Sequence, residues 1–264
     1  MFDMIKKIVQ YPRITRKYPK EALDHGPILG KPEIDSAQCT FCGACILSCP
    51  ASAIVMVTEK KEIGINLDQC IFCTLCSEIC PVNAVRITHE VELAVKNRND
   101  LRKTPAVIEK QDIPGLSYEI MGEKIQQKAR QTFGRSLQIR EVDAGSCNGC
   151  DYEINSLNNP VNDLERLGMH FVASPRHADL LLVTGTATRN MELALVKTYN
   201  AAPDPKLVVA VGACACSGGI FRDSYATRNG IDCILPVDVY IPGCPPRPEA
   251  IMYGILKALD RIID

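Results

Sequence analysis

CTFCGACILSCP at residues 39–50 is repeated as CIFCTLCSEICP at residues 70–81. Each copy has the bacterial ferredoxin spacing, in which three closely spaced thiolates hold one 4Fe–4S cluster and the fourth Cys ligates the other cluster. A two-residue gap in a tight loop brings successive thiolates to adjacent irons. The spacing therefore predicts two crossed ligand sets: Cys39, Cys42, Cys45 and Cys80 for the first cluster, and Cys70, Cys73, Cys76 and Cys49 for the second.

The repeat extends beyond the cysteines, because Gln38 corresponds to Gln69 and Ala53 to Ala84. Self-similarity at a fixed period indicates one supersecondary unit used twice. Paired zinc sites are the alternative, since repeated Cys-x2-Cys also suits tetrahedral zinc. The successive x2 gaps and the x3-Cys-Pro ending, present in both copies, favour a two-cluster ferredoxin module. We expect a short helix after Cys49 or Cys80 in each copy, and strands at the β-branched runs Ile54–Val57 and Val85–Thr88.

Length and composition indicate a globular chain of two domains. It has 264 residues, of which 46% are apolar and 23% charged, and a formal net charge of −1. That balance indicates neither nucleic-acid binding nor a generic attraction to anionic lipid. Fourteen cysteines predict metal thiolates in a reducing, cytoplasmic compartment. The start of the chain does not resemble a signal peptide, and the longest apolar runs are shorter than the roughly 18 residues of a membrane span.

Changes in composition divide the chain into four parts. The first is a basic, proline-interrupted arm, which we expect either to lie over a partner or a membrane-proximal surface, or to fray in solvent. The third is charged and cysteine-free, and is expected to form a partly helical connector laid against a partner, with one helical piece at Gly122–Gln131. The predicted parts are the arm 1–31, the ferredoxin-like domain 32–92 (α+β), the connector 93–138, and a C-terminal domain 139–264.

The C-terminal domain shows strand-like apolar runs alternating with helical stretches. Leu180–Thr184, Leu207–Val211 and Val237–Ile241 are the strand candidates; Met191–Tyr199 and Glu249–Ile263 are the helical ones. Such alternation predicts an α/β unit with a parallel, flavodoxin-like sheet. Ligands of such sheets lie beyond the carboxyl ends of the strands, which is where the remaining cysteines fall.

Four of those six cysteines are candidates for a further 4Fe–4S cluster. Cys147-x2-Cys150 is a ligand pair, Cys214 follows the second strand run and Cys244 the third. Flanking glycines allow backbone N–H groups to approach the sulfurs. Cys216 and Cys233 remain unassigned, because a buried Cys is more often a small apolar side chain.

Four motifs of this domain resemble one family: Gly145–Asp151, Ser174–Asp179, Gly212–Gly219 and Pro242–Pro248. The family is the small subunit of energy-converting (group 4) nickel–iron hydrogenases, including formate hydrogenlyase-type enzymes, and is similar to the terminal-cluster subunit of respiratory complex I. Complex I-type relatives place two adjacent cysteines where this chain has Cys147-x2-Cys150. The amino-terminal half resembles the two-cluster subunit of the same complexes, so the chain resembles a fusion of both.

The resemblance implies an electron-transfer subunit that carries three 4Fe–4S clusters and no catalytic residues of its own. Electrons would pass between a low-potential donor (ferredoxin, a formate dehydrogenase or a carbon monoxide dehydrogenase) and a nickel–iron large subunit for hydrogen evolution or uptake. Membrane ion-translocating subunits are the other implied partners, with the chain peripheral on the inner face of the cell membrane. Alternatives are a nickel-free sulfur- or quinone-reducing complex and a stand-alone ferredoxin-type carrier.

Other chemistry is weakly indicated. The four histidines have no paired carboxylate or nucleophile, and no phosphate-binding glycine fingerprint follows a strand. Glu153, just after Cys150, is a candidate for proton relay, although a solvated carboxylate at a helix start is the favoured interpretation.

Overall fold

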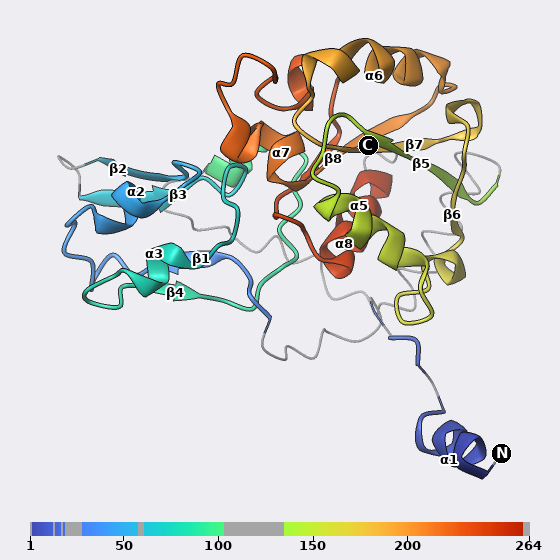
Figure 1. Cartoon of the computed structure of the whole chain (residues 1–264), viewed down its shortest axis with the longest axis horizontal. Helices are drawn as coiled ribbons and strands as arrows, with labels where there is room; N and C mark the ends of the chain where they lie inside the picture. The colour runs from blue at the N-terminus through green and yellow to red at the C-terminus, as the bar shows by residue number, and fades with distance from the viewer. Residues whose placement is uncertain are drawn as a thin grey trace.

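The computed structural model describes residues 2–12, 14–16, 18, 28–57, 61–102 and 135–260. A small cysteine-bearing module lies beside a larger module built on a five-stranded sheet (Figure 1). Both parts of the predicted fold class, the α+β ferredoxin-like module and the α/β module, are confirmed.

The small module contains two antiparallel strand pairs. β1 (Pro32–Ile34) pairs with β4 (Val85–Ile87), and β2 (Ile54–Val57) pairs with β3 (Glu62–Ile65). The first pair joins the strand before the first copy of the repeat to the strand after the second copy. The second pair joins the two strands that lie between the copies. The β-branched runs predicted as strands form β2 and β4.

The short helices of the repeat lie before the fourth cysteine of each copy, and the expectation of a helix after Cys49 or Cys80 is wrong. α2 spans Ala44–Ser48 and α3 spans Leu75–Glu78. A residue before proline is disfavoured in the α region. Cys49, which precedes Pro50, accordingly has ψ 111° and ends α2.

The large module holds an entirely parallel sheet with the strand order β6-β5-β7-β8-β9, which is the doubly wound flavodoxin order. β7 and β8 match the predicted runs, and β9 is shorter at its start. β5 and β6 were not predicted. The strands are β5 (Leu137–Asp143), β6 (Met169–Phe171), β7 (Leu180–Thr184), β8 (Leu207–Val211) and β9 (Val239–Ile241).

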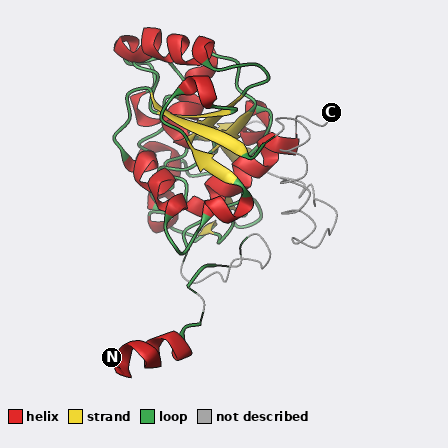
Figure 2. Cartoon of the chain, turned by 90° about the vertical axis from the view of Figure 1, so that its right-hand side faces the viewer, coloured by secondary structure: helices red, strands yellow, loops and turns green. Residues whose placement is uncertain are grey.

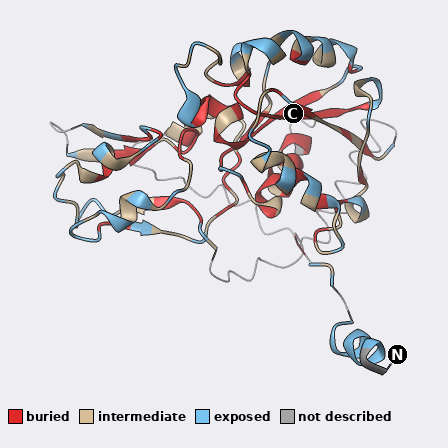
Figure 3. Ribbon diagram, in the orientation of Figure 1, coloured by how far each residue is buried: buried red, intermediate tan, exposed pale blue. Residues whose placement is uncertain are grey.

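Helices cover both faces of this sheet, with α6 on one face and α5 and α8 on the other (Figure 1). Strand residues alternate between the two layers: Leu181 and Val183 face the α6 side, whereas Leu180 and Leu182 face the α8 side. The sheet and α8 are largely buried (Figure 3). The helices are α5 (Gly149–Asn155), α6 (Arg189–Ala201), α7 (Gly212–Ser217) and α8 (Pro248–Asp260).

The two modules share a hydrophobic core. Ile63 and Leu67 of the small module belong to the same buried cluster as Leu181 and Ala215 of the large one. The start of the predicted connector packs on its own chain: Val95 makes an antiparallel bridge with Tyr240 of β9. The shared core and the Val95–Tyr240 bridge at the sheet edge together fix one module against the other.

Charged groups reinforce this junction. The fully buried Asp68 pairs with Arg98 and Arg102, which belong to a 3-10 helix spanning Arg98–Arg102. Arg98 also pairs with Asp232 of the large module, at 2.9 Å. One guanidinium therefore bridges a carboxylate from each module.

Part of the amino-terminal arm lies along the large module. Thr15 Oγ1 donates to the Pro160 carbonyl at 2.8 Å, and the Arg16 N–H donates to Val161 at 2.7 Å. Arg16 also pairs with Glu249, whose carboxylate is buried at the start of α8. These contacts bind the arm to the body of the chain.

Helix α1 (Phe2–Gln10) precedes these contacts and stands away from both modules (Figures 1 and 2). The predicted helical piece at Gly122–Gln131 and most of the predicted connector lie outside the described residues. Within the described ranges, no helix has the length and apolar character needed to cross a bilayer.

Candidate metal centres

The two ferredoxin loops have the same backbone conformation at corresponding positions. Phe41 and Phe72 have φ of 56° and 57°, and Ser52 and Asn83 have φ of 49° and 51°. Left-handed residues are uncommon outside glycine and persist where the surroundings over-determine them. Their recurrence at the repeat period shows that both copies wrap the chain around the cysteines in the same way.

Backbone N–H groups donate to cysteine sulfurs at equivalent positions of the two copies. Phe41 N–H donates to Cys39 Sγ and Phe72 N–H to Cys70 Sγ, both at 3.4 Å. Ala53 N–H donates to Cys49 Sγ at 3.3 Å, and Ala84 N–H to Cys80 Sγ at 3.2 Å. N–H donors to cluster sulfurs are among the determinants of reduction potential.

The cysteines gather in the crossed grouping predicted from the spacing. One cavity is lined by all four members of the first set, one of which comes from the second copy of the repeat: Cys39, Cys42, Cys45 and Cys80. In the second set, burial raises the pKa of Cys70, and the nearby thiolates of Cys76, Cys49 and Cys73 raise it further. The structure therefore brings each set together across the two copies.

The third set assembles at the carboxyl edge of the parallel sheet. Cys147 and Cys150 follow β5, Cys214 is in α7 directly after β8, and Cys244 follows β9. Burial, and then repulsion from the thiolates of Cys214, Cys244 and Cys147, raises the pKa of Cys150. Four thiolates from three strand ends thus lie close enough to interact.

Crowding of the thiols provides a test of whether a cluster fits. Burial, followed by repulsion between neighbouring thiolates, raises the pKa of Cys70 to about 12 and those of Cys76 and Cys214 to about 11. Iron is bound by thiolate, and a bound cation deprotonates a coordinating thiol. The residues therefore fit a cationic centre of several irons. Among the described residues, no three His, Cys, Asp or Glu side chains converge closely enough for one metal ion.

Gly212 brings the backbone close to a predicted ligand. It has φ +88°, and an added Cβ would lie 2.6 Å from Cys150 Sγ. We expect Gly212→Ala to displace this sulfur and, if each of the three cysteine sets holds one four-iron cluster, to lower the iron content of the chain by about one third. Iron and acid-labile sulfide analysis after anaerobic purification measures the loss.

Gly43→Ala is the matched control for that variant. Gly43 has φ +77°, but an added Cβ meets no atom within 4 Å, and Thr74 occupies the equivalent position of the repeat with φ 66°. The control should cost about 1–2 kcal/mol of stability through the strain of a left-handed backbone and keep its iron. Equal iron loss in the two variants would show that strain, not contact with Cys150, is responsible.

The three sets follow one another through the chain's body. Cys45 of the first set and Cys76 of the second interact electrostatically, as do Cys73 of the second and Cys244 of the third. A hydrogen bond also joins the segments that carry the second and third sets: the hydroxyl of the buried Ser217 of α7 donates to the Asp68 carbonyl at 2.6 Å. Asp68 lies two residues before Cys70, and Ser217 three residues after Cys214.

The two unassigned cysteines lie differently. Cys216 is fully buried, with its Sγ 3.6 Å from the Ile241 carbonyl oxygen and 3.8 Å from that of Ala210, which suits a small buried side chain. Cys233 is exposed, beside Asp232. Neither is among the thiols that surround Cys150 most closely.

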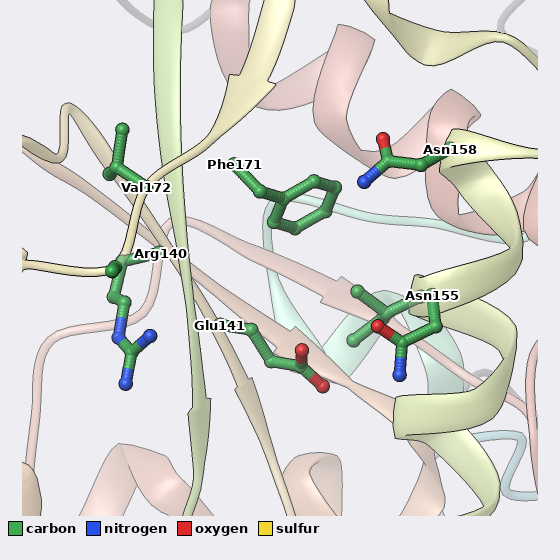
Figure 4. Close-up of a pocket in the computed structure, with 8 residues that line it drawn as sticks. Arg140, Glu141, Asn155, Asn158, Phe171 and Val172 are labelled. Atoms are coloured by element: carbon green, nitrogen blue, oxygen red, sulfur yellow. The ribbon is translucent and has the colours of Figure 1, made fainter.

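A polar cavity of about 240 Å³ lies between β5 and the α5 region. Glu141 and Asn155 are on its wall, with Phe171 between the strand side and the helix side (Figure 4). Glu141 shares a hydrogen bond with Asp151, which also accepts from Ser146 Oγ at 2.5 Å and Thr184 Oγ1 at 2.8 Å. Burial, then this hydrogen bond and the Asp151 charge, raises the pKa of Glu141 to about 8.

This carboxyl pair predicts a pH-dependent stability. The pKa of Glu141 in the folded chain lies above its ordinary value. Its stabilising contribution to the free energy of unfolding is therefore complete at acid pH and is lost as pH rises through about 8. The free energy of unfolding should therefore fall more between pH 6 and pH 9 in the native chain than in Glu141→Gln. Allowing for solvent screening at this half-buried site, the difference should be on the order of 1–2 kcal/mol. Anaerobic urea titrations at several pH values test this, and parallel profiles would contradict it.

Sequence reasoning missed Glu141. The available signal was the alternation Leu137-Gln138-Ile139, which marks the start of a strand and places Glu141 on the same face as Leu137 and Ile139. For Glu153 the sequence favours a solvated carboxylate over a proton relay. Burial raises the pKa of Glu153, and the charge of Arg247 opposes the rise.

Two family models match the chain. Residues 147–258 match the NADH ubiquinone oxidoreductase 20 Kd subunit, and residues 31–81 match a 4Fe-4S dicluster domain. The matched ranges contain the third set of cysteines and the first two sets, respectively.

Curated relatives agree with these matches. The chain is 52% identical over 131 residues to the probable membrane-bound hydrogenase subunit mbhJ of Pyrococcus furiosus, covering 49% of this chain and 78% of that one. It is 52% identical over 125 residues to formate hydrogenlyase subunit 7 of Escherichia coli, covering 47% and 49%. A subunit of the NADH-quinone oxidoreductase of Geobacter metallireducens is 53% identical over 114 residues, covering 43% and 66%.

Proposed function

We propose that this chain, a member of the family of the NADH ubiquinone oxidoreductase 20 Kd subunit and nickel–iron hydrogenase small subunits, is the electron-transfer subunit of a membrane-associated nickel–iron hydrogenase. In this chain the family domain is joined to a 4Fe-4S dicluster domain. The observation that carries the proposal is the succession of three cysteine sets through one fixed body. The hydrogenase-like Cys147-x2-Cys150 spacing and the relatives mbhJ and formate hydrogenlyase subunit 7 support the choice of hydrogenase.

The chain's residues would hold three 4Fe–4S clusters, which exchange single electrons when bound. Three sets of four thiols supply the ligands. N–H donors such as Phe41 and Ala84 would stabilise negative charge on the sulfurs. The shared core and the Arg98 bridge would hold the second and third sets at a fixed separation. The ligand sets proposed are Cys39, Cys42, Cys45 and Cys80; Cys70, Cys73, Cys76 and Cys49; and Cys147, Cys150, Cys214 and Cys244.

The proposed partners follow from the ends of this series. Cys42 at one end and Cys147 and Cys244 at the other are exposed. An electron donor would dock at the Cys42 end, and the nickel–iron large subunit at the Cys147 end. The nickel ligands would belong to that large subunit. Ion-translocating subunits would hold the complex at the inner face of the membrane.

The test is isolation of the native complex through this chain under anaerobic conditions, with nickel analysis and hydrogen-dependent dye reduction. We expect nickel in equimolar amount with the chain, and hydrogen uptake. A complex with full iron but neither nickel nor hydrogen activity would contradict the hydrogenase assignment and indicate a sulfur- or quinone-reducing relative. Recovery of the chain alone, with its clusters intact and no partner, would indicate a stand-alone carrier.

A further inference from the structure

Helix α1 has an apolar side that no described residue of the two modules covers. Every described side chain from Met4 to Gln10 is exposed. The exposed fractions of the large apolar side chains are 69% for Met4, 53% for Ile5, 63% for Ile8 and 75% for Val9. Exposing these apolar side chains to water costs free energy, and an exposed apolar patch of this kind marks a site of interaction with a protein or a membrane.

The apolar residues occupy one side of the helix. Met4, Ile5, Ile8 and Val9 follow the i, i+1, i+4, i+5 spacing, which at about 100° per residue places them on a single face. Lys6 and Lys7 fall on opposite borders of the remaining polar face by the same geometry. Lysines at such borders can keep their ammonium groups in the headgroup layer while their stems cover apolar surface, as in helices that lie in a membrane interface.

Charge around the helix indicates the chemistry of the occupant. Helix α1 carries one acidic residue, Asp3, and two lysines. From Met4 to Lys20 the sequence then has no Asp or Glu and six cationic residues: Lys6, Lys7, Arg13, Arg16, Lys17 and Lys20. The overall net charge of −1 conceals this local excess. The charge of Arg16 is neutralised by its ion pair with Glu249. The other cationic residues are complementary to an anionic surface.

The contacts that follow α1 give it a fixed attachment. Thr15 and Arg16 are hydrogen-bonded to Pro160 and Val161, so the helix projects from a defined place on the large module (Figure 2). A helix held in this way can lie on a surface without loosening the two cluster-bearing modules.

From these observations we propose that α1 is an interfacial anchor that binds the anionic lipid surface of a membrane, with Met4, Ile5, Ile8 and Val9 in the acyl boundary and Lys6 and Lys7 at the headgroups. This extends the proposed membrane association, in which partner subunits alone hold the chain, and gives this chain a lipid contact of its own. The site requires no cluster and no electron transfer, so its failure would leave the proposed function untouched.

The absence of tryptophan from the chain provides a clean reporter. Full-length chain carrying Ile8→Trp, reconstituted anaerobically, would be mixed with phosphatidylcholine vesicles containing one quarter phosphatidylglycerol. We expect the emission to shift to the blue and to be quenched more by lipids with brominated acyl chains than by the unbrominated ones. Vesicles of phosphatidylcholine alone should give weaker binding, because the cationic contribution is removed.

Two variants made in the Ile8→Trp background separate specific insertion from adsorption. Val9→Glu should weaken vesicle binding at least about tenfold, because it places a charge on the apolar side. Leu193→Glu, at an exposed apolar residue of α6 (64%), should leave binding unchanged. Equal losses in the two variants, or no bromolipid quenching, would overturn the proposal. Burial of the reporter in the detergent-solubilised complex without quenching in vesicles would do the same, and would assign the apolar side to a protein groove.

Discussion

Cys244→Ala is expected to remove the proposed third cluster and, with it, the hydrogen-dependent activity of the proposed complex. The Cys244 thiol is one of four that surround the carboxyl edge of the sheet, and the other three cannot supply its iron ligand from their own strand ends. Iron should fall from about twelve to about eight per chain. Hydrogen-dependent dye reduction should fall by more than about 100-fold, since removing a ligand exceeds the 10–100-fold loss typical of outer-shell partners.

Cys233→Ala is the control for this ligand variant. Cys233 is an exposed cysteine of the same module that lies outside the three sets, so both its iron content and its activity should match the native chain. If Cys244→Ala kept its iron, the assignment of the third set would be wrong. If Cys233→Ala lost a similar amount of iron, general instability of the module would explain both results.

Arg98→Met is expected to weaken the junction between the modules. The Arg98 side chain is only 15% exposed and donates to Asp68 at 3.0 Å and to Asp232 at 2.9 Å. Removing one partner of a buried ion pair typically costs about 3–5 kcal/mol. We expect a loss near the lower end of that range, because Arg102 still pairs with Asp68 at 2.7 Å. Urea unfolding under anaerobic conditions measures this free energy.

Arg86→Met is the matched control within the small module. Arg86 pairs with Glu33 at 2.7 Å, but its side chain is 76% exposed. A surface pair of this kind contributes about 0–1 kcal/mol. Similar losses in the two variants would show that the Arg98 bridge contributes no more than a surface pair. Hydrogen exchange should locate the Arg98→Met effect on both sides of the junction, near Asp68 and Asp232.

Local sequence signals predicted the elements whose structure depends on local chemistry. The repeated cysteine spacing predicted the two-copy loops, and the continuous apolar runs at Leu180–Thr184 and Leu207–Val211 predicted central parallel strands. β5 was missed because charged residues interrupt its apolar pattern. The loop helices lie before Cys49 and Cys80, where they were not predicted, and α2 ends at Cys49 because a residue before proline is disfavoured in the α region.

Long-range contacts could not be predicted from one sequence. Arg98 lies in a charged stretch that is typical of a connector, and its carboxylate partners are 30 residues before it and 134 residues after it. Arg16 similarly pairs with Glu249 from the far end of the chain. The strand-end cysteines were easier to predict, since the carboxyl ends of parallel strands meet at one edge whatever their separation in sequence.

The measurement that tests the central claim most directly is Mössbauer spectroscopy, with iron and sulfide analysis, of the full chain reconstituted anaerobically with isotope-enriched iron. We predict about twelve irons per chain, all in 4Fe–4S clusters that take up about three electrons on full reduction. About eight irons and two electrons, or zinc in place of iron at the cysteine sets, would contradict a series of three clusters in this chain.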